Sequence, residues 1–173
     1  MILTGMQIKK EIEAGNIFIS DFDEKRLGPN SYNLRLYNKL MIYANDVLDM
    51  KRKNNCIELT IPKEGLILEP GELYLGKTIE YTECGNFVPM IEGRSSVARL
   101  GLKVHLTAGF GDIGNKLSWT LELEATKRIR IYPDVEVCQI YYNTVMGDTS
   151  IRYDGKYQNG KEIEPSKLYK DFE

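Results

Sequence analysis

This sequence is poor in the residues that hold catalytic metal ions. Its 173 residues include one histidine and three cysteines, Cys56, Cys84 and Cys138, and it contains no Cys-x-x-Cys pair. A zinc deaminase needs a histidine or cysteine ligand followed later by such a pair, with a glutamate beside the first ligand. If this chain deaminates a base, it must therefore activate water without zinc.

Long apolar runs and concentrated charge are also missing. No stretch approaches the roughly 18 apolar residues of a membrane span, and the N-terminus lacks the basic flank and apolar run of a secretion signal. The net charge is −2, so no global positive field attracts nucleic acid or an anionic membrane. The odd, scattered cysteines indicate no disulfide framework. We therefore expect a cytoplasmic protein with neither a nucleic-acid nor a membrane partner.

The composition that remains is that of one globular domain with an N-terminal helix. Hydrophobic residues make up 42% and charged residues 28% of the chain, as in ordinary globular proteins, and this length can bury a sizeable core. Thr4 and Gln7 form a capping-box pattern, which predicts a helix over residues 4–14. We expect residues 1–173 to form a single domain.

After residue 30 the hydrophobic period changes to the alternation of β-strands. Strands are expected at residues 31–36, 57–61, 67–69, 73–78, 88–91, 102–108, 118–124 and 135–142. A short helix is expected over residues 95–100. Proline and glycine separate the strands, so the pattern predicts a mainly β fold, either a distorted barrel or a jelly roll. Residues 147–173 form a polar tail, which is either a frayed terminus or a segment that closes over a ligand.

Groups that could bind an anion are concentrated between positions 92 and 102. Arg94 and Arg99 flank Ser95 and Ser96. If Ser95 begins a helix, its backbone N–H groups and the positive helix end point at one place. The arginines could add charge-assisted hydrogen bonds there. The residues alone leave a second interpretation open, a capped helical turn with two solvated arginines.

This stretch, residues 93–102 (GRSSVARLGL), closely resembles the signature helix of the dCTP deaminases, and a shorter version of it resembles the trimeric dUTPases. Further segments agree with the same family in order and spacing. They are residues 29–36 (PNSYNLRL), 107–112 (TAGFGD), 119–122 (WTLE) and 155–158 (GKYQ). The resemblance spans almost the whole chain. It implies a dUTPase-like fold in which the tail, residues 147–173, closes over the active site.

The resemblance implies zinc-independent hydrolysis of dCTP to dUTP and ammonia, a step that supplies dUMP and dTTP precursors. Glu122 would be the catalytic carboxylate that moves protons between water, the ring and the leaving amine. Ser95, Arg99 and the backbone carbonyl of Ala108 would hold the attacking water. Without the resemblance, Glu122 would be a solvated side chain on the polar face of a strand.

The resemblance also implies how the nucleotide is held. Asp112 would bond the 3′-hydroxyl of the sugar, and cationic groups of the signature helix and of the tail would meet the phosphates. The implied substrate-binding residues are Arg94, Ser95, Ser96, Arg99, Asp112, Thr120, Leu121, Glu122, Gln139, Tyr153, Lys156 and Gln158. No protein metal site is expected, because Mg²⁺ arrives bound to the triphosphate.

Other functions remain compatible with the same fold. A bifunctional enzyme would take dCTP to dUMP, and the ending at residues 168–172 weakly resembles such relatives. A dUTPase would cleave between the α- and β-phosphates and would not need Glu122. A non-catalytic nucleotide-binding regulator would need neither Glu122 nor Arg99 and Ser95 together. The family resemblance further implies a homotrimer and dTTP as a feedback ligand.

The single histidine, His105, is expected to be a structural residue or a polar neighbour of other groups. Its parity with Lys103 places it on the strand face opposite Val104 and Leu106. A catalytic role would need a partner that the sequence does not show.

Overall fold

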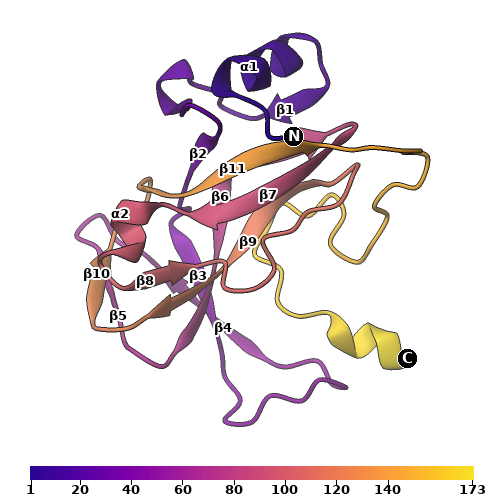
Figure 1. Ribbon diagram of the computed structural model, residues 1–173. Helices are drawn as coiled ribbons and strands as arrows, with labels where there is room; N and C mark the ends of the chain where they lie inside the picture. The colour runs from indigo at the N-terminus through magenta and orange to yellow at the C-terminus, as the bar shows by residue number, and fades with distance from the viewer.

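The computed structural model describes residues 1–173 and is mainly β (Figure 1). The elements, in chain order, are α1 (Gly5–Glu13), β1 (Ile17–Ile19), η1 (Glu24–Arg26), β2 (Tyr32–Arg35), β3 (Lys39–Tyr43), β4 (Cys56–Thr60), β5 (Leu66–Leu68), β6 (Leu73–Cys84), β7 (Phe87–Gly93), α2 (Ser95–Ala98), β8 (Leu102–Val104), β9 (Lys116–Ala125), β10 (Ile129–Ile131), β11 (Glu136–Thr144) and η2 (Leu168–Phe172).

The strands form three antiparallel sheets. The largest has the order β4-β3-β6-β9-β8, with β1 paired to the far end of β6. A second sheet has the order β2-β11-β7, and β5 pairs with β10. No continuous ladder joins the three, so they do not close into a barrel. The expected mainly β fold is confirmed, and its layered sheets are compatible with a jelly roll.

Alternating side chains from the two larger sheets build one core. Tyr32 and Leu34 of β2 share a hydrophobic cluster with Ile140 of β11 and with Leu121 and Leu123 of β9, and all five are fully buried. Because successive side chains of a strand point to opposite faces, burying these leucines turns the residues between them away from the core. This alternation positions the polar face of β9.

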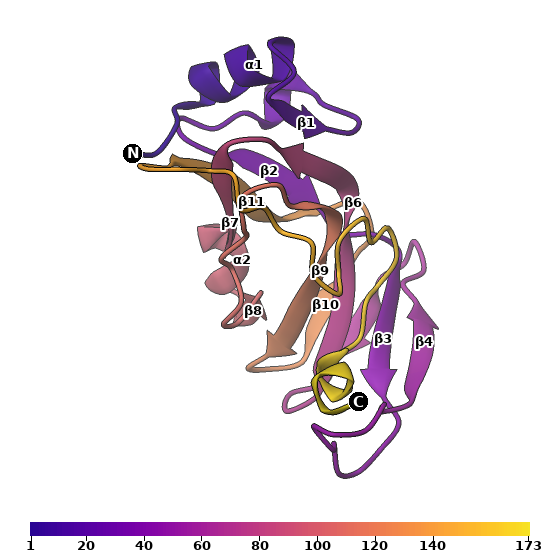
Figure 2. The same cartoon turned by 90° about the vertical axis from the view of Figure 1, so that its right-hand side faces the viewer.

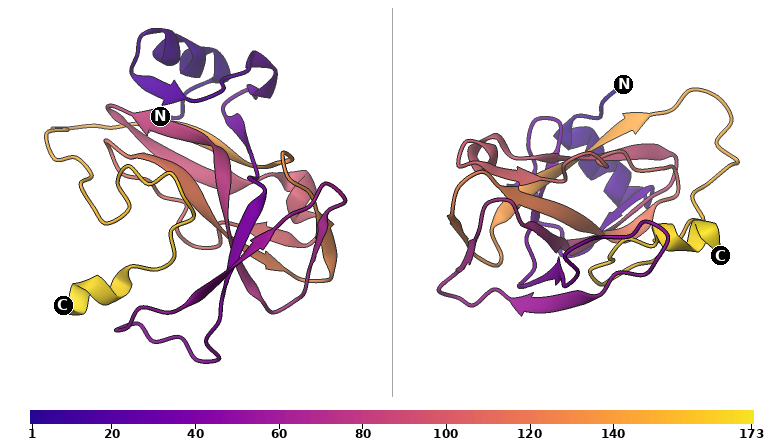
Figure 3. Two further views of the ribbon diagram at one scale, coloured as in Figure 1. Left: turned by 180° about the vertical axis from the view of Figure 1, so that it is seen from behind. Right: turned by 90° about the horizontal axis from the view of Figure 1, so that it is seen from below.

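The N-terminal helix is confirmed as α1. The Thr4 hydroxyl accepts a hydrogen bond from the Gln7 N–H at 3.2 Å, and Ile8 is fully buried. Together with β1, the helix covers the end of the molecule opposite the β3–β4 hairpin (Figure 3).

Several strand boundaries differ from the sequence predictions. The strand expected over residues 102–108 ends at Val104, because His105 has a positive φ of 59° that an extended strand cannot continue. The strand expected over residues 73–78 continues to Cys84. The short strands β1, β3 and β10 were not predicted, and the helix expected over residues 95–100 is the single turn α2.

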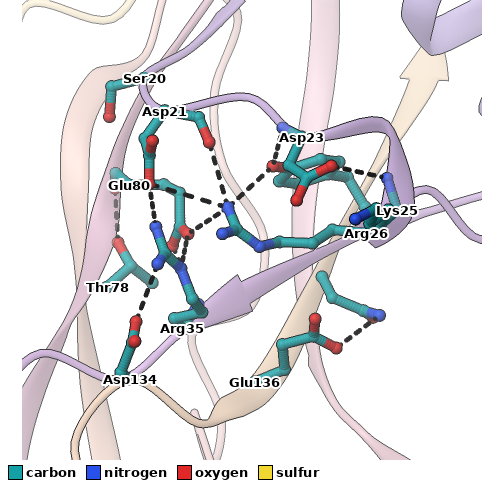
Figure 4. A network of polar contacts seen from close by, with 12 residues as sticks. Ser20, Asp21, Asp23, Lys25, Arg26, Arg35, Thr78, Glu80, Asp134 and Glu136 are labelled. Atoms are coloured by element: carbon teal, nitrogen blue, oxygen red, sulfur yellow. Dashed lines mark hydrogen bonds and ion pairs between the residues drawn. The ribbon is translucent and has the colours of Figure 1, made fainter.

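A buried ionic network connects the two larger sheets (Figure 4). The Glu80 carboxylate of β6 is fully buried and lies 2.7 Å from Arg35 Nε of β2. Arg35 also contacts Asp134 at 2.8 Å and Asp21, and Arg26 approaches Glu80 at 3.5 Å. Burial acts to lower the pKa of Arg35, and hydrogen bonds to Glu80 and Asp21 outweigh it and raise that pKa. The guanidinium therefore stays charged and ties β2 to β6.

Replacing Glu80 with alanine should destabilise the protein strongly. The change leaves Arg35 and Arg26 without their buried carboxylate, and breaking one partner of a buried ion pair costs about 3–5 kcal/mol of unfolding free energy. Urea unfolding at fixed protein concentration measures this loss. A matched control is Glu124→Ala, which removes a half-exposed ion pair with Lys103 and should cost at most about 1 kcal/mol. Equal losses in the two variants would contradict the importance of the network.

Candidate active site

A cavity of about 470 Å³ opens between β9, the loop of residues 105–115 and the C-terminal tail. Its volume lies within the range of about 300–1,000 Å³ that small-molecule sites occupy. Thr120 and Glu122 reach it from β9 because Leu121 and Leu123 are committed to the core. The alternation of one strand therefore places a carboxylate in a partly apolar cavity.

The loop of residues 105–115 forms one wall of the cavity and is tethered to β7. The Gly109 carbonyl accepts from the Ile91 N–H at 2.8 Å, and the Gly111 N–H donates to the Pro89 carbonyl at 2.9 Å. A Cβ on Gly111 would lie 2.7 Å from the Trp119 ring and 2.9 Å from the Pro89 carbonyl oxygen, so only glycine allows this approach. The tether brings the loop residues Ala108 and Asp112 to the cavity wall.

Glu122 has a close polar neighbour in His105. His105 Nδ1 lies 3.0 Å from Glu122 Oε2, and the His105 side chain is 5% exposed. Its other ring nitrogen, Nε2, lies 2.8 Å from the Ala108 carbonyl oxygen, and the ring meets Trp119 edge-on with centroids 6.0 Å apart. The expected polar-neighbour role of His105 is confirmed, and its partner is the predicted catalytic glutamate.

The C-terminal tail runs beside the open edge of β9 (Figure 2). Strand β8 pairs with β9 only at residues 123–125, which leaves the earlier part of that edge free. There the Ser118 N–H donates to the Gly160 carbonyl at 2.9 Å and the Asn159 N–H donates to the Lys116 carbonyl at 2.7 Å. The tail residues Tyr153 and Tyr157 line the cavity.

Further hydrogen bonds attach the tail to the largest sheet. The Glu164 N–H donates to the Thr120 hydroxyl at 2.9 Å, and the buried Lys77 ammonium donates to the Lys161 carbonyl. The final turn, η2, rests near the β3–β4 loop, where the Lys51 ammonium lies 5.2 Å from the centre of the Phe172 ring.

The predicted site residues fall into two groups. Those that line the cavity are Ala108, Asp112, Thr120, Glu122 and Tyr153. Those that do not line it are Arg94, Ser95, Ser96, Arg99, Leu121, Gln139, Lys156 and Gln158. On α2 and at its end, Ser95, Ser96 and Arg99 are exposed to solvent, while Arg94 pairs with Glu136 at 2.9 Å. The predicted anion-binding groups and Glu122 are thus separate within one chain.

The remaining members of the second group make contacts within the chain. The Leu121 side chain is in the core, because it alternates with the cavity-facing residues. Gln139 accepts from the Ser31 hydroxyl at 2.8 Å, and Lys156 pairs with Asp171. The Gln158 amide donates to the Gly114 carbonyl at 2.8 Å. Within one chain, none of these four residues lines the cavity.

Sequence reasoning missed Asn115. This residue is 6% exposed and lines the cavity, and its Oδ1 has no hydrogen-bond partner. An unpaired buried amide oxygen carries a desolvation cost that a ligand donor can remove. Only the turn after Asp112, where the Asn115 N–H donates to the Asp112 carbonyl at 3.2 Å, brings this amide to the cavity.

No group of three or more His, Cys, Asp or Glu side chains is arranged to hold a metal ion. None of the helices is long and apolar enough to cross a membrane. All three cysteines are free thiols, with Cys84 and Cys138 buried.

Taken together, the fold and cavity define a mainly β protein with a carboxylate and a histidine in a small-molecule site. The chain belongs to the dCTP deaminase-like family, whose sequence pattern matches residues 2–145. It is 56% identical over 173 residues to a protein of Hathewaya histolytica, covering 100% of both chains, and 57% identical to one of Cytophaga hutchinsonii, covering 100% of this chain and 99% of the other. Both relatives are named "dCTP deaminase, dUMP-forming".

A solved structure has the same fold. It is the 2′-deoxycytidine 5′-triphosphate deaminase from Agrobacterium tumefaciens, with a TM-score of 0.61 and 19% sequence identity. The likeness covers 83% of this chain and 48% of that one, so this chain spans about half the length of the solved protein.

Replacing Asn115 with alanine should lower the affinity for nucleotide more than it lowers the stability of the free protein. In the free protein the change removes an unpaired acceptor, whereas in the complex it removes a hydrogen bond worth about 0.5–1.5 kcal/mol. Titration calorimetry with dCTP and thermal melting without it separate the two effects. The control is the exposed Asn30→Ala. Unchanged dCTP affinity in the Asn115 variant would show that no ligand group pairs with this amide.

Proposed function

We propose that this chain catalyses the hydrolytic deamination of dCTP, with Glu122 as the proton-transfer group. One observation carries the proposal: Glu122 lines a ligand-sized cavity, with His105 at 3.0 Å and Ala108 on the cavity wall. Membership of the dCTP deaminase-like family supports the same reaction.

In this proposal water adds to C4 of the cytosine ring. The Glu122 carboxylate takes a proton from the water as the C4–O bond forms, and passes it to ring N3. Glu122 then takes the remaining proton of the C4 hydroxyl and delivers it to the exocyclic amine. The C4–N bond breaks, ammonia leaves, and C4 keeps its oxygen as a carbonyl. The carboxylate ends the cycle as it began.

The sugar and phosphates would occupy the rest of the cavity. Asp112 is the only aspartate that lines it and is suited to accept a hydrogen bond from the 3′-hydroxyl of deoxyribose. Tyr153 would cover the nucleotide from the tail. Mg²⁺ would enter as part of the substrate, bound to phosphate oxygens and water.

We further propose dUMP as the final product. The bifunctional reaction is favoured over simple dUTP release by the names of the Hathewaya and Cytophaga relatives, which are dUMP-forming. A second water would hydrolyse the bond between the α- and β-phosphates and release pyrophosphate. The overall change would be dCTP and two waters to dUMP, ammonia and pyrophosphate.

The proposed assembly is a homotrimer in which one subunit completes the site of another. Within a single chain, Ser95 and Arg99 are exposed and outside the cavity that contains Glu122. The apolar side chains Leu100 and Phe110 are also exposed, 70% and 65% respectively. A neighbouring copy that covered them would bring its own signature helix to the phosphates. Binding of dTTP in the same cavity as a feedback ligand is part of this proposal.

The Glu122→Gln variant should bind dCTP and fail to release ammonia. The amide keeps the size of the side chain and cannot accept the water proton, so the rate should fall by about 10²–10⁴-fold. Purified wild-type and variant proteins are incubated with dCTP and, separately, with dUTP in Mg²⁺. Ammonia and pyrophosphate are followed while chromatography resolves the nucleotides. The matched control is Glu124→Gln on the same strand.

The products distinguish the candidate reactions. Ammonia with dUMP from wild-type protein supports the bifunctional proposal, and ammonia with accumulating dUTP limits the enzyme to deamination. Pyrophosphate from dUTP without ammonia from dCTP would make the protein a dUTPase only. Undiminished ammonia release by Glu122→Gln would remove Glu122 from the mechanism.

Mixing two inactive variants should restore activity if the site is shared between subunits. Ser95→Ala and Glu122→Gln would each lack one half of every site, whereas mixed trimers contain some sites with both residues intact. The measurement is ammonia release after the variants are dissociated and reassembled together, with each variant treated alone as the control. Activity no higher than in the separate variants, or a hydrodynamic mass of one 19.8 kDa chain, would contradict the shared site.

A further inference from the structure

His105 contacts Glu122 through both its backbone and its side chain. The His105 N–H donates to the Glu122 backbone carbonyl at 2.8 Å, and Nδ1 lies 3.0 Å from the Glu122 carboxylate. The residue adopts a φ of +59°, which is uncommon outside glycine and persists where the surroundings enforce it. This conformation turns the ring away from the path of a strand and toward Glu122.

The second contact of the ring determines where its hydrogen lies. A carbonyl oxygen only accepts, so Nε2 at 2.8 Å from the Ala108 carbonyl must carry a hydrogen. The Nε2 hydrogen bond therefore fixes the orientation of the ring, which places Nδ1 3.0 Å from the Glu122 carboxylate.

This pair is isolated from other hydrogen-bonding groups of the chain. His105 Nδ1 and Glu122 Oε2 are both buried and neither has a hydrogen-bond partner, so the two groups lie 3.0 Å apart without a hydrogen bond between them. The other titratable groups lining the cavity are Tyr43, Asp112, Tyr153, Tyr157 and Glu164, and none forms a hydrogen bond or an ion pair with the His105 side chain. On the adjoining strands, Lys103 and Glu124 pair with each other.

We propose that His105 is a positioning residue for Glu122: its ring packs against the carboxylate, and its Nε2 hydrogen bond holds the Ala108 carbonyl beside it. This inference rests on the proposed deamination. The ring occupies the space beside the carboxylate and so limits the directions in which Glu122 can turn within the cavity. Each proton that Glu122 takes from water or from the C4 hydroxyl passes to N3 or to the leaving amine, and His105 exchanges no proton.

The test uses variants that tolerate the left-handed backbone at this position. His105→Gly removes the ring without backbone strain, and His105→Asn keeps a short donor near the position of Nδ1. The glycine variant should lower kcat by about 10–100-fold, with little change in KM. The asparagine variant should recover part of kcat, because its amide can again contact the carboxylate.

The outcomes separate this inference from the proposed function. Thermal melting and dCTP affinity, measured on the full chain, report whether the variants fold and bind. A glycine variant that folds with unchanged kcat, while Glu122→Gln remains inactive, overturns the role of His105 and leaves the deaminase intact. A fall in kcat matched by an equal loss of dCTP affinity, or without recovery by asparagine, also overturns it. Full activity of Glu122→Gln would defeat the proposed function itself.

Discussion

The two-residue period of β9 is the constraint on which the site depends. Leu121 and Leu123 fill the core between the two larger sheets, and this commitment leaves Thr120 and Glu122 no direction except the cavity. The buried contact between Glu80 and Arg35 then fixes the second sheet against the first. Packing on the core face of β9 therefore decides which of its side chains line the cavity. A one-residue slip of β9 would place Glu122 in the core.

Much of this arrangement could be predicted from local patterns. The capping box at Thr4 gave the correct helix, and the alternation around Glu122 gave its correct face. The partner of His105 could not be predicted, because the contact depends on β8 ending one residue earlier and on a positive φ that no local pattern encodes. Local patterns also did not indicate where the tail packs, since its backbone pairs with the edge of β9 and such pairing carries little side-chain information; only the family resemblance implied a tail over the site.

The separation of the signature helix from the carboxylate has a physical explanation. A helix of one turn cannot project Ser95 and Arg99 across a sheet, and α2 packs beside β8 at the end of β9 away from Thr120. Under the proposed function, recognition of the triphosphate and proton transfer by Glu122 would therefore depend on different regions of the chain. Under the proposed assembly, neither process needs to distort the core.

The position of the tail also affects the tendency of the protein to self-associate. Residues 116–118 of β9 are hydrogen-bonded on their open side by Asn159 and Gly160. A strand edge with free N–H and C=O groups is a template for pairing with other chains, and proteins commonly cover such edges. A ligand that displaced the tail on entering the cavity would uncover this edge for as long as the tail stayed away. Ligand entry and exposure to self-association would then share one motion.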